Sequence, residues 1–199
     1  MFTTVSGRRA SCDIRDCEAK GHIEAAPHYN SIFKYLENPG LTPILKALVE
    51  ESAAPLKTIE TDFAVDSSGF SSCVFERWFD VKWGKMRSEH RWVKAHLMTG
   101  VTTNVVTSVE VTPTESNDSP HLEPLLTATA KRFPVAEVSA DKGYISKRNL
   151  EVIVNAGAVP YIPFKSNTTG EGPELWRRMF HFYQFKRCEF LASYHKRSN

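Results

Sequence analysis

The chain has 199 residues, of which 41% are hydrophobic and 24% charged, a composition that favours a folded protein with a sizeable core and excludes a disordered or fibrous one. Its formal net charge of +2 is too small to indicate a nucleic-acid partner by itself. Residues 1–9 lack the apolar stretch of a signal peptide, and no run approaches the length of a membrane span. We therefore expect a soluble, cytoplasmic protein with no membrane partner.

Residues 1–57 predict a helical N-terminal segment. Helices are expected over 11–20, 29–37 and 41–52, and the last two have apolar residues at helical spacing. Pro39, Gly40 and Pro55 mark the joins. After residue 58 the pattern changes to one of strands, so we place the domain boundary there.

Residues 58–199 predict alternating strands and helices. Strands are expected over 63–67, 92–98, 104–111, 135–140 and 159–164. Helices are expected over 121–132, over 147–156 and from about residue 174 towards the C-terminus. This order predicts an α/β fold in which a mixed sheet is flanked by helices and the crossover connections join parallel strands.

Two aspartates close short apolar runs that predict strands. Asp66 follows Phe63-Ala64-Val65, and Asp141 follows Val138-Ser139-Ala140. If these two strands are parallel neighbours, their carboxyl ends meet at one edge of the sheet and bring the two aspartates together.

Two adjacent carboxylates repel each other unless a proton or a cation lies between them. Mg²⁺ favours carboxylate oxygen, and such a site is typical of phosphoryl transfer with two metal ions about 3.5 to 4 Å apart. The alternative is that each aspartate only forms a turn or caps a helix. Other metal sites are not indicated, because Cys12, Cys17, Cys73 and Cys188 form no CxxC pair and His90, His96, His121 and His181 have no ligand spacing.

Basic residues are concentrated near the C-terminus. Between residues 177 and 197 a single acid, Glu189, accompanies six basic residues: Arg177, Arg178, Lys186, Arg187, Lys196 and Arg197. Basic and aromatic residues also alternate between Trp78 and Lys94, a pattern that suits contact with phosphates and bases. Solvated charge and buried aromatic residues are the alternative explanation for both stretches.

Three elements in a fixed order carry a resemblance to a known family. They are Asp62-Phe63-Ala64-Val65-Asp66-Ser67-Ser68-Gly69-Phe70, Asp141-Lys142-Gly143-Tyr144 and Tyr194-His195-Lys196-Arg197. With these elements the chain resembles the DDE transposases of prokaryotic insertion sequences. In one large group of them the third acid follows the pattern Tyr, two residues, Arg, three residues, Glu. Tyr194 and Arg197 match that pattern, and the Glu would fall two positions beyond Asn199.

The resemblance implies that residues 58–199 form a ribonuclease-H-like catalytic core. In it, Asp66 and Asp141 would bind Mg²⁺ or Mn²⁺, with two ions in the complete enzyme. The implied partner is double-stranded DNA, cleaved at transposon ends and joined to a target, with a homodimer expected for pairing two ends. Residues 1–57 are a further candidate for DNA binding. The candidate DNA contacts in the core are Lys142, Arg177, Arg178, Lys186, Arg187, Tyr194 and Arg197.

Glu189 is a poor substitute for the third acid. It lies twelve residues before the expected position, roughly 18 Å along a helix, and points in a different direction. We expect it to be a surface or salt-bridging residue and the 199-residue chain to be deficient in catalysis. Two alternatives stay open, a non-catalytic DNA-binding remnant of a transposase and a ribonuclease-H-like nuclease without strand transfer.

Overall fold

The computed structural model describes residues 7–71, 92–113 and 115–198. These residues belong to two compact units, residues 1–47 and 48–199. No helix within the described ranges combines the length and the apolar character needed to cross a membrane.

The first unit consists of helices. Helices α1 (Gly7–Ala19) and α2 (Tyr29–Leu36) contact each other, and α3 (Leu41–Ala53) begins in this unit and continues into the second. His28 begins α2 by accepting a hydrogen bond through Nδ1 from the backbone N–H of Asn30, at 3.2 Å. The side chains of Phe33 and Leu36 remain exposed, so this unit has little core of its own.

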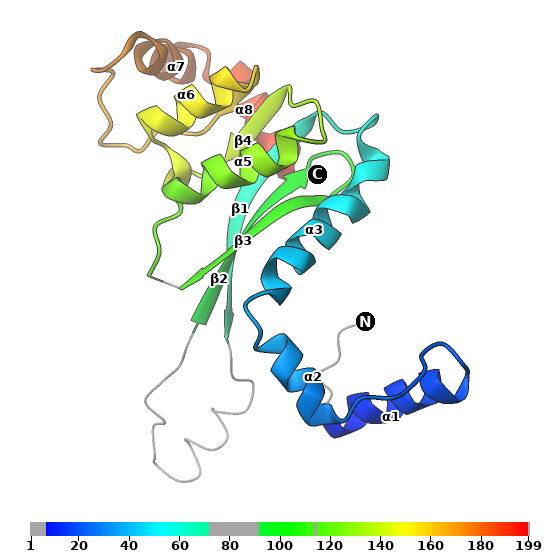
Figure 1. Cartoon of the computed structure of the whole chain (residues 1–199). Coiled ribbons are helices and arrows are strands. Elements are labelled where there is room, and N and C mark those ends of the chain that lie inside the picture. The colour runs from blue at the N-terminus through cyan, green and yellow to red at the C-terminus, as the bar shows by residue number, and fades with distance from the viewer. Residues whose placement is uncertain (1–6, 72–91, 114, 199) are drawn as a thin grey trace, which may run out of the picture. The chain divides into compact units, whose positions relative to one another are not determined.

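The second unit is built on a five-stranded mixed sheet (Figure 1). The strands are β1 (Asp62–Ser71), β2 (Trp92–Gly100), β3 (Val106–Pro113), β4 (Glu137–Ala140) and β5 (Val159–Tyr161). They lie in the order β3-β2-β1-β4-β5, with β1, β2 and β3 antiparallel and β1, β4 and β5 parallel. This arrangement confirms the predicted α/β fold with β1 as the central strand.

Helices cover both faces of the sheet. The α-helices are α5 (Leu122–Ala130), α6 (Lys147–Asn155), α7 (Glu174–Phe185) and α8 (Arg187–His195). Short 3₁₀ turns η1 (Ala54–Leu56), η2 (Ser119–His121), η3 (Lys142–Tyr144) and η4 (Lys196–Ser198) complete the unit. In Figure 1, α5 lies in front of the sheet and α8 behind it, and the contacts of α5 with β2 and β3 and of α8 with β4 and β5 agree with that view.

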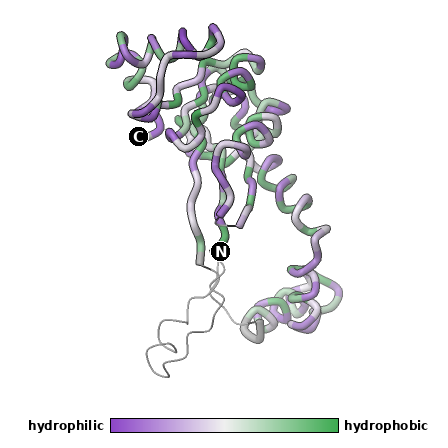
Figure 2. Tube along the Cα trace, turned by 90° about the vertical axis from the view of Figure 1, so that its left-hand side faces the viewer, coloured by the Kyte–Doolittle hydropathy of each residue, from purple (hydrophilic) through white to green (hydrophobic). Residues whose placement is uncertain are grey.

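Alternate residues of β1 face these two layers. Phe63 and Val65 are buried in the core, where the Phe63 ring meets the edge of Phe133 at 5.6 Å between centroids. Asp62 and Asp66 face the other side, where residues of η4 reach them. In the helices, hydrophobic and hydrophilic residues alternate along the trace, as expected for helices with one buried face (Figure 2).

Three elements differ from the prediction. The predicted strand 63–67 continues to Ser71, so Asp66 lies within β1 and not at its end. The predicted strand 159–164 ends at Tyr161, and Ile162 and Phe164 are buried without continuing it. The predicted single C-terminal helix is two helices, because Lys186 leaves helical geometry with φ −120° and ψ 43°. This break lets α8 return to β4 and β5, where Phe190 packs 5.4 Å from the ring of Tyr161.

Cys12, Cys17 and Cys188 form no disulfide bond with one another. The alternation of basic and aromatic residues between Trp78 and Arg91 lies outside the described residues.

Candidate active site

The parallel pairing of β1 with β4 brings Asp66 and Asp141 to neighbouring positions. Val65 pairs with Ala140 at the end of this ladder, and the two aspartates are the next residues, Asp66 within β1 and Asp141 directly after β4. Both side chains are at the surface. The two aspartates lie far apart in the chain, and the β1–β4 register is what makes them neighbours.

Asp66 is open to solvent but has two partners. Its side chain is 64% exposed, its Oδ1 accepts from the backbone N–H of Ser67 at 2.8 Å, and its Oδ2 accepts from Nη2 of Arg197 at 3.0 Å. The Arg197 side chain is only 14% exposed and lies over the ring of Tyr194, 5.3 Å from the centroid. Its Nη1 is buried and has no hydrogen-bond partner among the described residues. A buried N–H group without a partner next to a carboxylate suits an incoming anionic oxygen.

Asp141 begins the turn η3. Its side chain accepts a hydrogen bond from the backbone N–H of Gly143, as the turn-forming explanation predicted. Because this contact engages Oδ1 alone, the structural role leaves Oδ2 available for another partner. Lys142, the next residue, is exposed beside it.

A polar network lies beneath the two aspartates. Asp118, from the connection between β3 and α5, accepts from Nζ of Lys94 at 2.7 Å and from the hydroxyl of Ser67 at 3.4 Å. The Tyr144 hydroxyl shares a hydrogen bond with Nδ1 of His96 at 2.9 Å. The buried His96 ring also bonds Thr112 through Nε2, at 3.1 Å, and stacks on the ring of His121.

Burial sets the protonation states in this network. Burial, followed by the negative charge of Asp118, raises the pKa of Tyr144, with smaller contributions from Asp66 and Asp141. Burial, followed by His121, lowers the pKa of His96, against the opposing effect of Asp118. The pair is therefore neutral at pH 7, a protonated phenol beside an uncharged imidazole.

No role for His96, His121 or Asp118 was predicted from the sequence. The available signal was the alternation of β2, which places His96 on the same face as the buried Met98. Asp118 carried only the weak signal of an acid before Ser119-Pro120 at a helix start.

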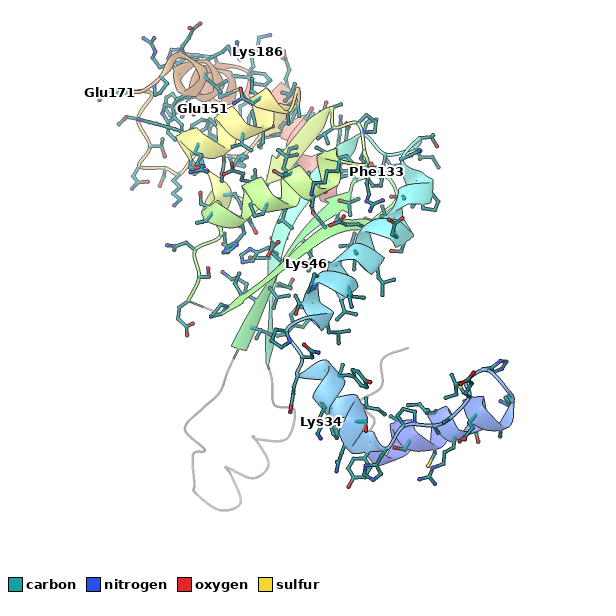
Figure 3. The ribbon with its side chains drawn as sticks, in the orientation of Figure 1. Lys34, Lys46, Phe133, Glu151, Glu171 and Lys186 are labelled. Carbon is teal, nitrogen blue, oxygen red and sulfur yellow. The ribbon has the colours of Figure 1, made fainter. Side chains whose placement is uncertain are left out.

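The remaining predicted DNA contacts lie on α7, at its end and at the start of α8. Arg177 and Arg178 are exposed on α7. Lys186 lies at the outer end of α7 (Figure 3) and forms an exposed ion pair with Glu189 at 3.3 Å, which agrees with the surface role predicted for Glu189. Arg187 lies over the ring of Tyr183, 5.1 Å from its centroid. The structure thus brings Arg197 into contact with Asp66, and Tyr194 into contact with Arg197. The other five predicted contacts, Lys142 included, are exposed at the surface.

A family model described as the transposase DDE domain matches residues 57–188, about two thirds of the chain. The chain belongs to the transposase DDE domain family. Membership confirms the resemblance seen in the sequence and implies an enzyme that transfers phosphoryl groups on DNA. The matched range includes Asp66, Asp141 and the network around Tyr144, and it ends before Tyr194 and Arg197. No curated protein matches the chain.

Transposases of this family generally use divalent metal ions, and the residues at the sheet edge suit one. Asp66 offers an exposed carboxylate and Asp141 lies next to it, and one or two carboxylates with water and substrate phosphate are the usual ligands of Mg²⁺. Among the described residues no three acidic, histidine or cysteine side chains are grouped closely enough to enclose an ion. The fit is thus to an open site formed by two carboxylates.

Proposed function

We propose that this transposase domain cleaves the DNA strand at transposon ends and joins the freed end to a target, with Asp66 and Asp141 as its metal ligands. The observation that carries the proposal is the β1–β4 register, which makes two exposed carboxylates immediate neighbours. Divalent cations held by Asp66 and Asp141 would supply activation of the attacking oxygen and stabilisation of the leaving oxygen. The metal would be Mg²⁺ or Mn²⁺, with two ions in the complete site.

Arg197 has a separate role in this proposal. Its guanidinium neutralises Asp66 in the absence of a cation, and its buried Nη1 has no partner among the described residues. An arginine fork suits a DNA phosphate, so the same side chain is free to bind substrate once a cation takes over the carboxylate. Tyr194 holds the guanidinium in place through its ring.

DNA is proposed to lie along the basic residues outside α7 and at the start of α8. Arg177, Arg178, Lys186 and Arg187 would contact the phosphate backbone, and Lys142 would contact it beside Asp141. The helical segment 1–57 is a second candidate DNA-binding region. A homodimer would allow two transposon ends to be held together.

Cation binding is the direct test of the carboxylate pair. In isothermal titration of Mn²⁺ into the 199-residue polypeptide, we expect binding that is lost in Asp66→Asn and in Asp141→Asn. Glu151→Gln is the matched control, because Glu151 is an exposed acid on α6, away from the sheet edge (Figure 3). Equal Mn²⁺ affinity in all four proteins would show that the aspartates are not ligands.

The DNA interface has its own test. The double variant Arg177→Gln/Arg178→Gln should weaken binding to duplex DNA of any sequence and reduce the slope of log affinity against log salt by about two. Lys131→Gln/Lys165→Gln removes the same charge from two exposed positions that are not among the proposed DNA contacts and is the control. Equal salt slopes for the two double variants would rule out α7 as a DNA-binding surface.

Catalysis is tested with plasmid DNA. With only the two proposed carboxylates present, we expect a polypeptide of residues 1–199 to bind Mn²⁺ and DNA but to cleave slowly. Efficient cleavage by it that Asp66→Ala abolishes would overturn that expectation. Hydrolysis that never produces joined ends would favour a nuclease without strand transfer.

A further inference from the structure

Asp118 lies between the two segments that carry the proposed metal ligands, the middle of β1 and the turn η3 after β4. On one side its Oδ1 accepts from the hydroxyl of Ser67, the residue after Asp66. On the other side its Oδ2 faces Gly143, where an ideal Cβ would lie 3.0 Å from Asp118 Oδ2 and 3.6 Å from Asp141 Oδ1. Asp118 therefore touches the neighbours of both aspartates while belonging to neither strand.

Asp118 is poorly suited to be a metal ligand itself. Its Oδ1 already receives the Lys94 ammonium group at 2.7 Å, and its side chain is only 25% exposed, against 64% for Asp66. A cation there would have to displace a paired lysine at a partly buried position. The Lys94–Asp118 pair is instead a fixed polar support beneath the more exposed aspartates.

Tyr144 connects this support to the core. Its ring is 1% exposed, and it ends the turn η3 that Asp141 begins, so any movement of the ring moves the turn. Its hydroxyl is fixed by His96, which is itself held by Thr112 on β3 and by the stacked ring of His121. The negative charges of Asp118, Asp66 and Asp141 all contribute to raising the pKa of this hydroxyl.

The geometry requires such a support. Mg²⁺ takes ligands at about 2.0 to 2.1 Å in nearly octahedral geometry, so two carboxylates on different strands must be held at a closely defined separation. Among the described residues the Asp141 side chain is held within its own turn, and Asp66 is held by its neighbour and by Arg197. Neither of these contacts joins one aspartate to the other.

We propose that Asp118, Tyr144 and His96 form a positioning group that fixes the separation of Asp66 and Asp141 and thereby sets the affinity of the site for divalent cations. This inference rests on the proposed function of the two aspartates. None of the three residues needs to touch the cation or the DNA, because they act through Ser67, Gly143 and the turn η3.

Tyr144→Phe tests the inference most directly, because it removes the hydroxyl, leaves the buried ring and changes no charge. We expect its affinity for Mn²⁺ to fall about tenfold, as when other partners that orient metal ligands are removed. The electron paramagnetic resonance spectrum of bound Mn²⁺ should broaden, since the ligands are held less uniformly. Tyr183→Phe is the control, because Tyr183 packs against Phe164 and Phe190. It should leave the Mn²⁺ affinity and the spectrum unchanged.

Asp118→Asn is the second variant and keeps the inference testable if Tyr144→Phe does not fold. It also should weaken Mn²⁺ binding, and circular dichroism of each variant without metal identifies any loss of fold. Wild-type affinity in a folded Tyr144→Phe, or in Asp118→Asn if the tyrosine variant is unfolded, would overturn the positioning role. If Asp66→Asn still abolished binding, the proposed metal ligands would stand. If the wild-type chain bound no Mn²⁺, the proposed function and this inference would both be wrong.

Discussion

Glu60 and Asp66 lie on either side of the segment in which β1 pairs with β4, yet their surroundings are opposite. Glu60 is fully buried, and its carboxyl group accepts from the backbone N–H groups of Thr102 and Thr103 and from the Thr103 hydroxyl. Asp66 is 64% exposed and has one backbone and one arginine partner. The fold uses up the hydrogen-bonding capacity of the first acid and leaves much of the second available, which is what separates a structural carboxylate from a potential ligand.

The same distinction applies to the two ends of the segment in which β1 pairs with β4. Where this pairing begins, Asp62 and Glu137 share Nζ of Lys196 at 3.1 and 2.8 Å. Just beyond its other end, Arg197 is the basic side chain that meets Asp66, and Asp141 meets no basic side chain among the described residues. Adjacent residues of η4 thus serve opposite ends, Lys196 in an enclosed ion-pair cluster and Arg197 at an open carboxylate.

Removal of the Glu60 side chain is expected to have the largest effect on folding. Glu60→Ala leaves two backbone N–H groups of the β2–β3 turn without their acceptor and opens a cavity, so the free energy of unfolding should fall by about 2 to 4 kcal/mol. Urea denaturation followed by circular dichroism measures this. Asp66→Asn is the comparison and should change stability by less than about 1 kcal/mol.

Gly100→Ala provides a second way to disturb the hydrogen bonds between Glu60 and the β2–β3 turn. A Cβ at Gly100 would collide with the Glu60 side chain, which has no room to move. It should also lower stability, while its Mn²⁺ affinity per folded molecule stays at the wild-type value. If Asp66→Asn proved as destabilising as Glu60→Ala, the distinction between a structural and an available carboxylate would be lost.

Arg197→Gln should have a smaller effect, in the opposite direction on metal binding. Without the guanidinium, the Asp66 carboxylate has no competing cation, and the site carries more negative charge. Mn²⁺ affinity should therefore rise about two- to fivefold, a change in binding free energy similar to that of one surface ion pair. Titration calorimetry measures it. Arg178→Gln removes an exposed arginine from α7 and should leave the affinity unchanged. Weaker binding in Arg197→Gln would mean that the arginine supports the cation site rather than competing with it.

Much of the fold could be predicted from the sequence because its strongest signals are local. The apolar runs before Asp66 and Asp141 and the alternation of strands with helices suffice for a parallel β1–β4 pair. The break at Lys186 could not be predicted in this way. Gln184-Phe185-Lys186-Arg187 contains no glycine or proline, and the helix ends there because Phe190 must pack against Tyr161, a long-range contact.

The candidate site shows the same limit. Asp66 and Asp141 follow visible apolar runs, and Tyr194 and Arg197 belong to a recognisable pattern, so all four could be singled out. Asp118, His96 and Thr112 could not, because their significance depends on which side chains the sheet register brings together. Arg197 was predicted as a phosphate contact, and its ion pair with Asp66 becomes apparent only when η4 is seen behind β1.

Lys196→Met should have the smallest effect and completes the comparison with Arg197. The hydrogen bond to Glu137, together with that to Asp62, raises the pKa of Lys196 against the opposing effect of burial. Since this pKa is higher in the folded than in the unfolded chain, the stabilisation is complete below the unfolded value of about 10.4 and is lost as the pH rises through the folded value. The side chain is 41% exposed, so the variant should lose no more than about 1 kcal/mol at pH 7.

The pH dependence of stability and the Mn²⁺ affinity together distinguish the role of Lys196 from that of Arg197. Urea unfolding at pH 7, 9 and 11 should show a stability difference between wild type and Lys196→Met that is constant over the first two values and shrinks at the third. The matched variant Lys142→Met removes an exposed lysine beside Asp141 and should show no such difference. Mn²⁺ affinity should stay at the wild-type value in Lys196→Met, because Asp62 and Glu137 lie at the amino ends of the strands. An increase like that expected for Arg197→Gln would mean that charge anywhere on η4 controls the site, and that the contact between Arg197 and Asp66 has no special role.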